Sequence, residues 1–288
     1  MSGWVTELHP EVVAMLEEQR RGGAKPRSQM TVEETRVAMT AGRKWQLAPP
    51  ANVPVRDAVA NGVPVRLYGD EHARTLLYLH GGRFFSGNLD SHDWPLRLLA
   101  DVSKVRICAV NYRLAPEHRH PAAVEDTIAA GRWLRGQTDE MIVGGDSAGG
   151  YLAALGALAL HPVLQVLIYP MLDPATDTAS YREYWQGPWP SGEDMARGWE
   201  LYGGEAVNAG SGAFPSTLLV TAGVDALRDE AMAFGASLRA CGVAVEEVHY
   251  PDMHHGFFTQ TRLARSRELI QWLAAALRRH LPLSSGRK

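Results

Sequence analysis

Six short apolar runs recur along this chain without the strict polar–apolar alternation of a one-sided sheet. They are 76-LLYL-79, 105-VRICAV-110, 141-MIVG-144, 165-QVLIY-169, 217-TLLVTA-222 and 245-VEEVHY-250. Helix-like segments separate most of them, at 93–103, 121–135, 148–160 and 228–241, and a final one lies near 262–280. Continuous apolar strands that alternate with helices are typical of a parallel sheet covered on both faces. We therefore predict an α/β fold with a mostly parallel sheet, in which the more polar run at 245–250 lies near an edge.

An antiparallel hairpin is predicted ahead of these runs. Residues 53–69 hold two alternating stretches around Asn61-Gly62, a dipeptide that favours a type I′ turn.

Two further regions break the strand–helix rhythm. Residues 7–43 are polar and helical in pattern, with Thr31 and Glu34 spaced as a capping box. Residues 170–215 contain no strand pattern and many Pro, Gly and aromatic residues, which predicts short helices, one near 192–203.

Composition excludes several classes of partner. A formal charge of −3 over 288 residues offers no basic face for nucleic acid or anionic lipid. No run approaches the ~18 consecutive apolar residues of a membrane span, and the N-terminal residues lack the pattern of a signal peptide. The two cysteines, Cys108 and Cys241, cannot form a disulfide framework and suit a reducing compartment. We expect a cytoplasmic protein.

Ser147 lies in 145-GDSAG-149, which fits Gly-x-Ser-x-Gly between a strand and a helix. A sharp strand-to-helix turn would strain the serine backbone and bring neighbouring chain close. Glycine two positions to either side removes the Cβ atoms that would clash there. The hydroxyl would then project above the sheet, at a helix N-terminus that favours developing negative charge. Ser147 is therefore the candidate nucleophile.

A serine nucleophile needs a base, and the base needs an orienting group. Asp225, Asp229 and Glu230 follow the run at 217–222, while His254 and His255 follow the last run. The order serine, acid, histidine is that of α/β-hydrolases. We prefer Asp225 because it comes first after its strand, and His255 because it precedes a glycine. The neighbouring Asp229 would cap or pair locally, and His254 would pack beside the site.

Together these residues resemble the hormone-sensitive-lipase-like esterases of the α/β-hydrolase superfamily, the bacterial family IV carboxylesterases. The resemblance covers about 30–280 and is carried by five stretches: 80-HGGRFFSGN-88, 111-NYRLAPEHRHPAAVED-126, 144-GGDSAGG-150, 223-GVDALRDE-230 and 254-HHGFF-258. It implies a triad of Ser147, Asp225 and His255.

The resemblance also implies an oxyanion hole formed by backbone amides. Its donors would be the amides of Gly81, Gly82, Arg83 and Ala148.

A cap over a single hydrolase domain, 1–288, is likewise implied. Residues 1–45 and 173–215 would form it. The predicted lining of the substrate pocket, which the cap would share, is Arg83, Phe84, Tyr184, Trp185, Trp189 and Trp199. The resemblance further implies a homodimer formed through the last strand and the neighbouring helix.

Two positions depart from the family pattern. Arg83 replaces the third glycine of the usual His-Gly-Gly-Gly loop, and Ala226 replaces a proline. The Arg83 guanidinium either points to solvent or into a salt bridge, or it reaches the pocket and favours a substrate that carries a carboxylate. Ala226 would change only the stiffness of the loop that carries Asp225.

The predicted activity is that of a serine carboxylesterase acting on short-chain acyl or small aryl esters, without a cofactor or metal. The pair His118 and His120 has no evident third ligand. Asp146 is expected to anchor the serine turn. An amidase or aryl formamidase on the same fold is the alternative, because esters and amides share the tetrahedral intermediate. A ligand-binding receptor on this fold is a more remote one.

Overall fold

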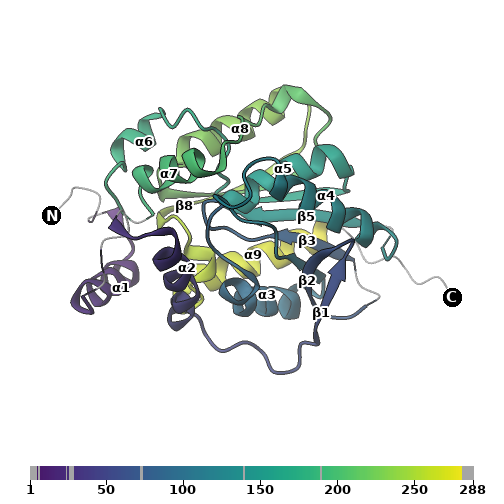
Figure 1. Ribbon diagram of the computed structural model, residues 1–288, viewed down its shortest axis with the longest axis horizontal. Coiled ribbons are helices and arrows are strands. Elements are labelled where there is room, and N and C mark those ends of the chain that lie inside the picture. Colours follow the sequence, from purple (N-terminus) through teal and green to yellow (C-terminus); the bar gives the residue numbers. More distant parts are fainter. Residues whose placement is uncertain are drawn as a thin grey trace.

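The predicted strands form one mixed sheet in the computed structural model of the chain (Figure 1). Within the described residues its order is β1-β2-β4-β3-β5-β6-β7-β8. The strands are β1 (Val55–Ala60), β2 (Val63–Tyr68), β3 (Thr75–Leu79), β4 (Arg106–Val110), β5 (Met141–Asp146), β6 (Leu164–Ile168), β7 (Thr217–Val224) and β8 (Val245–His254). Strands β3 to β8 are parallel, and β1 and β2 are antiparallel to their neighbours.

The structure describes residues 5, 7–23, 25, 29–71, 74–138, 140–188 and 190–280. Across these ranges, no helix has both the length and the apolar character needed to cross a membrane.

Helices cover both faces of the sheet, as the apolar strands predict. Figure 1 shows α4, α5 and α8 on one side and α3 and α9 on the other. Their bounds are α3 (Leu89–Ser103), α4 (Ala122–Arg135), α5 (Ala148–Leu160), α8 (Arg228–Ala240) and α9 (Ala264–His280). Because β3, β4, β5 and β6 are buried along their whole length, both of their faces require apolar side chains.

Most element boundaries agree with the sequence, but α3 begins four residues before the predicted start. Asn88 and Ser91 form a reciprocal capping box there, with Asn88 Oδ1 accepting from the Ser91 amide at 2.8 Å. An asparagine–serine pair satisfies the same free amides as the more familiar serine–glutamate pair, so the helix starts at Leu89.

The hairpin and the edge strand are confirmed. Asn61 and Gly62 have φ values of 49° and 89°, as a type I′ turn requires, and β1 pairs with β2 in antiparallel register. Strand β8 lies at the end of the sheet, is only partly buried over most of its length, and continues to His254. Its extra residues bring the chain to the carboxyl edge just before His255.

The segments outside the strand–helix rhythm also form helices. They are α1 (Pro10–Arg21), α2 (Val32–Ala41), η3 (Gly42–Trp45), α6 (Ala179–Glu183), α7 (Gly192–Tyr202) and the short turns η4 (Ala209–Ser211) and η5 (Phe257–Thr259). The capping box of Thr31 and Glu34 and the helix near 192–203 are both confirmed. In Figure 1, α1, α2, α6 and α7 all lie toward the left of the molecule.

The central strands should dominate stability. Leu77 of β3 is fully buried, whereas Val59 of the edge strand β1 is 64% exposed. Leu77→Ala should lower the free energy of unfolding by about 2–5 kcal/mol, because it removes transfer energy and leaves a cavity. Val59→Ala, the control, should change it by less than about 0.5 kcal/mol. Urea unfolding followed by circular dichroism measures both, and equal losses in the two variants would contradict this view of the core.

Candidate active site

Ser147 occupies a strained turn between β5 and α5. Its φ of 56° and ψ of −122° lie outside the regions that residues with side chains usually adopt. Gly145 and Gly149 flank it, and a Cβ on either one would overlap the carbonyl oxygen of Leu79 at the end of β3. Glycine at both positions is therefore a steric requirement, and the chain after β3 lies directly against the serine turn.

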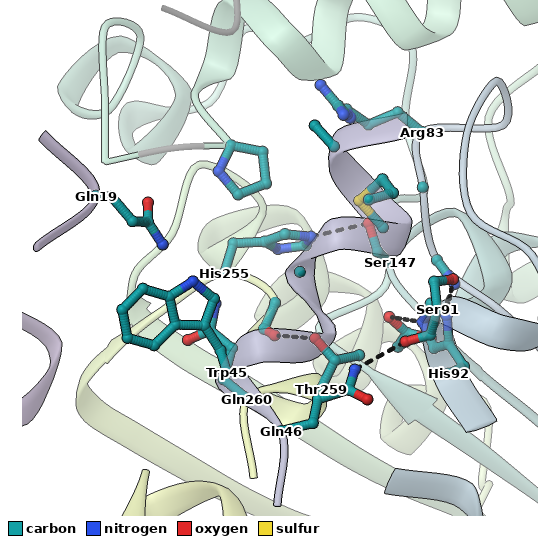
Figure 2. Close-up of a pocket in the computed structure, with 18 residues that line it drawn as sticks. Gln19, Trp45, Gln46, Arg83, Ser91, His92, Ser147, His255, Thr259 and Gln260 are labelled. Atoms are coloured by element: carbon teal, nitrogen blue, oxygen red, sulfur yellow. Dashed lines mark hydrogen bonds and ion pairs between the residues drawn. The ribbon is translucent and has the colours of Figure 1, made fainter. Parts of the chain in front are cut away.

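The structure brings Ser147, His255 and Asp225 together. His255 Nε2 lies 2.8 Å from Ser147 Oγ, and His255 Nδ1 lies 2.8 Å from Asp225 Oδ2 (the first contact is dashed in Figure 2). Since a carboxylate only accepts, Nδ1 carries the proton and Nε2 is left to accept from the serine hydroxyl. The other oxygen of Asp225 accepts from the Leu227 amide at 2.9 Å, which fixes the carboxylate.

The ends of β7 and β8 determine the positions of the Asp225 and His255 side chains. The β7–β8 pairing is irregular between Ala222 and Val224, where Gly223 lies so close to the carbonyl of Pro251 that a Cβ would clash. Such a bulge redirects the strand that follows it. His255 is then followed by Gly256, whose φ of 83° suits glycine and turns the chain away.

The rival side chains are engaged elsewhere. Asp229 accepts from the Ser180 amide at 2.8 Å and pairs with Arg228. Glu230 accepts from the Leu172 amide at 2.7 Å, and burial raises its pKa well above the usual range. His254 Nε2 lies 3.0 Å from the Gln260 side-chain oxygen. Of these candidates, only Asp225 and His255 are hydrogen-bonded in line with Ser147.

The loop after β3 supplies candidate oxyanion donors, with one correction. The Gly81 amide donates to Asp146 Oδ1 at 2.9 Å, so it holds the serine turn and cannot also serve an incoming oxygen. The amides of Gly82 and Ala148 make no hydrogen bond with any described protein acceptor. Arg83 adopts a φ of 56°, a left-handed conformation that suits the glycine of the family pattern and that a residue with a side chain adopts at a cost.

A buried polar network beneath this loop centres on Asp146. It accepts from the Tyr78 hydroxyl at 2.7 Å and lies 3.2 Å from His92 Nε2. Burial works to raise the pKa of Asp146, but His92 and the donors from Tyr78 and Gly81 together hold that pKa below its ordinary value. Asp146 is therefore a fixed anion that organises the turn, as the sequence predicts.

A cavity of about 740 Å³, including the part open to solvent, lies over Ser147 and His255 (Figure 2). The N-terminal helices contribute much of its wall through Gln19, Ala38, Met39, Gly42, Trp45 and Gln46. The remaining wall comes from the loop after β3, α3, Pro190 and the segment after His255. The sequence alone does not single out these N-terminal residues, because nothing in their local pattern shows which face of a polar helix turns toward the site.

The aromatic residues predicted to line this cavity lie elsewhere. Phe84, Tyr184 and Trp199 are almost fully buried but are absent from its wall, and Trp185 is 39% exposed on the surface. Phe84 stacks on Tyr202 with 4.0 Å between ring centroids and also contacts Trp199. Tyr184 donates to Glu7. Their apolar area is thus used to pack helices together. Trp189 lies outside the described residues.

Among the predicted pocket residues that the structure describes, Arg83 alone lines the cavity. Its guanidinium points away from Ser147 in Figure 2, and its Nη1 lies 3.4 Å from Asp194 Oδ1 of α7. Burial lowers the pKa of Arg83 to about 10, and Asp194 opposes this. The salt bridge is one of the two alternatives that the sequence left open. Contact between Arg83 and a substrate stays a prediction.

Buried neutral histidines around the site should make stability pH-dependent. Burial lowers the pKa of His254 to about 4, whereas an unfolded chain has a histidine pKa of about 6.5. As the pH falls through this window the unfolded state takes up a proton that the folded state does not, so stability is lost. Between pH 6 and 4.5, wild type should lose on the order of 1 kcal/mol per pH unit more than His254→Gln. Urea unfolding across this range measures the difference, and parallel curves would contradict it.

Comparison with known proteins agrees with this geometry. A family model described as the α/β hydrolase fold matches residues 76–259. The carboxylic ester hydrolase LipN of Mycobacterium tuberculosis is 33% identical over 261 residues, 77% of this chain and 68% of that protein. The ethyl acetate hydrolase of Pseudomonas putida is 32% identical over 252 residues, 76% of this chain and 79% of that protein. The crystal structure of an esterase from the bacterial hormone-sensitive lipase family is 27% identical with a TM-score of 0.85, covering 94% of this chain and 98% of its own. This chain belongs to the α/β hydrolase fold family, in the branch that resembles hormone-sensitive lipase.

Proposed function

We propose that this protein is a serine carboxylesterase whose catalytic residues are Ser147, His255 and Asp225. The observation that carries the proposal is the continuous hydrogen-bonded line from Ser147 Oγ through both nitrogens of His255 to Asp225, with 2.8 Å at each step. A base within hydrogen-bond reach of the nucleophile and itself oriented by an acid is the arrangement that acyl transfer requires. The names of the relatives as ester hydrolases support the same reaction.

The reaction proceeds through an acyl-enzyme. Ser147 Oγ attacks the ester carbonyl carbon while His255 Nε2 takes the serine proton, and Asp225 stabilises the imidazolium that forms. The carbonyl oxygen becomes an anion, which the amides of Gly82, Arg83 and Ala148 bind near the N-terminus of α5. Collapse of the intermediate expels the alkoxide, which leaves as the alcohol with the proton from His255. A water molecule then repeats the sequence on the acyl-serine and releases the carboxylic acid.

The substrates are esters with short acyl chains or small aryl groups. The polar side chains of Gln19, Gln46 and Gln260 share the wall of the cavity with Met39 and Trp45. A long alkyl chain would have to lie against these polar groups. The relative named ethyl acetate hydrolase fits this size class.

Residues 1–45 and 173–215 act as a cap on a single hydrolase domain. Support comes from α1 and α2, which contribute Gln19 and Met39 to the cavity wall, and from α7, which contacts the loop after β3.

Assembly and location follow as further parts of the proposal. The protein forms a homodimer through β8 and α9, because β8 is an edge strand whose outer backbone groups can pair. It acts in the cytoplasm, which suits its two free cysteines.

Removing the nucleophile should abolish hydrolysis. Wild type should cleave p-nitrophenyl acetate and butyrate much faster than the octanoate and palmitate, and Ser147→Ala should lower the rate on the short esters by several orders of magnitude. Release of p-nitrophenol measures both. Ser237→Ala is the control, because Ser237 is exposed on α8, donates to the Ala233 carbonyl of the same helix and does not line the cavity. Wild-type rates in Ser147→Ala would contradict the proposal, and preference for the matching anilides would indicate an amidase.

A further inference from the structure

Helix α7 lies directly on the loop that carries the candidate oxyanion donors. Gly198 of α7 has no room for a side chain, because an added Cβ would lie 2.8 Å from Arg83 Cβ and 3.0 Å from the Arg83 carbonyl oxygen. Real Cβ atoms essentially never come closer than 3.0 Å to another atom, so the contact with Arg83 Cβ would force the helix or the loop to shift. The helix backbone and the loop backbone are therefore in contact at this point.

The Arg83 side chain adds an ionic contact to the same helix. Its Nη1 lies 3.4 Å from Asp194 Oδ1, and both side chains are almost fully buried, at 4% and 3% exposure. The Asp194 carboxylate is itself held in place, since its Oδ2 accepts from the Ser191 amide and hydroxyl at 3.0 Å. The guanidinium also lies 4.8 Å from the centre of the Phe85 ring. This buried ion pair thus connects a fixed point on α7 to the loop.

The next loop residue contacts α7 through its ring. Phe84 stacks on Tyr202 with an angle of 8° between the ring planes, and it also contacts Trp199. Consecutive residues of the loop are therefore attached to the same helix, one by charge and the other by aromatic packing.

The loop needs such support because its backbone is strained. Arg83 and Phe84 have φ values of 56° and 66°, a left-handed conformation that residues with side chains adopt at a cost. Strained residues of this kind persist only where the surrounding structure holds them. Gly82 has a φ of 134°, and its carbonyl accepts from the amides of Phe85 and Ser86, so the chain turns just where the candidate donors lie.

We propose that the Arg83 side chain is a positioning residue, which together with Asp194 of α7 holds the oxyanion loop in its strained working conformation. This inference rests on the proposed esterase function. If the proposal holds, stabilisation of the oxyanion depends on the position of α7. When α7 moves away, the loop relaxes and its amides no longer point at the oxyanion. The substitution of arginine for the family's third glycine thereby supplies the loop with a contact that glycine could not make.

The alternative role for Arg83, recognition of a substrate carboxylate, makes a different prediction. A residue that binds the substrate directly changes KM for acidic esters and leaves neutral esters alone. A residue that positions the oxyanion donors changes kcat for every ester, because those donors act on charge that develops only in the transition state.

The test is a double-mutant cycle on Arg83→Met and Asp194→Asn, with Glu193→Gln as the control because Glu193 is an exposed acid on the same turn of α7. With p-nitrophenyl butyrate, each single variant should lose about tenfold or more in kcat, since removing one oxyanion donor outright costs about 10²–10³, while KM changes less than about twofold. The double variant should lose little more than either single one, because the two residues act as a unit. Glu193→Gln should behave as wild type.

A transition-state analogue gives the second readout. The Ki of a trifluoromethyl ketone, whose adduct with serine carries an oxyanion, should rise in proportion to the loss of kcat/KM. Unchanged kcat and Ki in both single variants would overturn the proposal. So would an effect confined to KM for an acidic ester, which would assign Arg83 to substrate recognition.

Two further measurements keep the outcome clear. Gly198→Ala favours a helix intrinsically but pushes α7 off Arg83, so it should lower kcat without unfolding the protein.

Hydrogen exchange separates failure of this inference from failure of the esterase function. The amides of Phe85 and Ser86, which donate to the Gly82 carbonyl, should exchange faster in Asp194→Asn than in Glu193→Gln, even if wild type hydrolyses no ester. Equal exchange in these two variants would overturn the proposal.

Discussion

The close approach of the serine turn to the end of β3 determines the geometry of the whole site. Gly145 and Gly149 leave room for the Leu79 carbonyl, so that the turn after β5 and the loop after β3 share one small volume. Any side chain at these two positions would separate them. Because β3 and β5 are adjacent parallel strands, their carboxyl ends meet at the same edge. The nucleophile and the amides that face it are therefore brought together by backbone packing before any side chain contributes.

Polar groups then hold this arrangement in the buried interior. Asp146 follows Gly145 directly and ties the serine turn to Gly81 and Tyr78, while His92 Nε2 of α3 lies 3.2 Å from its carboxylate. On the outer side, Asp194 of α7 reaches the same loop through Arg83. Buried charges need such partners, because an unpaired one would be costly. The loop after β3 is thus held from below by the sheet and from above by a helix that lies outside the strand–helix rhythm.

The sequence predicted what depends on local pattern. Apolar runs indicated the sheet, Asn61-Gly62 indicated the hairpin, and the order of Ser147, Asp225 and His255 indicated the three side chains that the fold places in hydrogen-bonded contact. The predicted start of α3 was wrong because an Asn–Ser capping box is a weak sequence signal for the beginning of a helix.

Long-range packing decided the rest. The direction in which the Gly81 N–H points is set by its hydrogen bond to Asp146, which lies 65 residues away in the sequence. Aromatic side chains in the 170–215 segment gave no sign whether they faced a substrate or another helix, and Phe84 and Trp199 turned out to pack against each other. Gln19, Met39 and Trp45 line the cavity instead. The sequence around them is polar or mixed, so it did not indicate that these side chains face the site.

Covalent labelling of the nucleophile would decide whether this site performs acyl transfer. Diethyl p-nitrophenyl phosphate should transfer one diethylphosphoryl group to Ser147 Oγ with release of one p-nitrophenolate, as seen by intact mass and peptide mapping. The adduct should form in wild type and be nearly absent in His255→Gln, because the serine then lacks its base. A modification at another residue, or full ester hydrolysis by a protein that forms no adduct at Ser147, would contradict the assignment of Ser147, His255 and Asp225 as the catalytic residues.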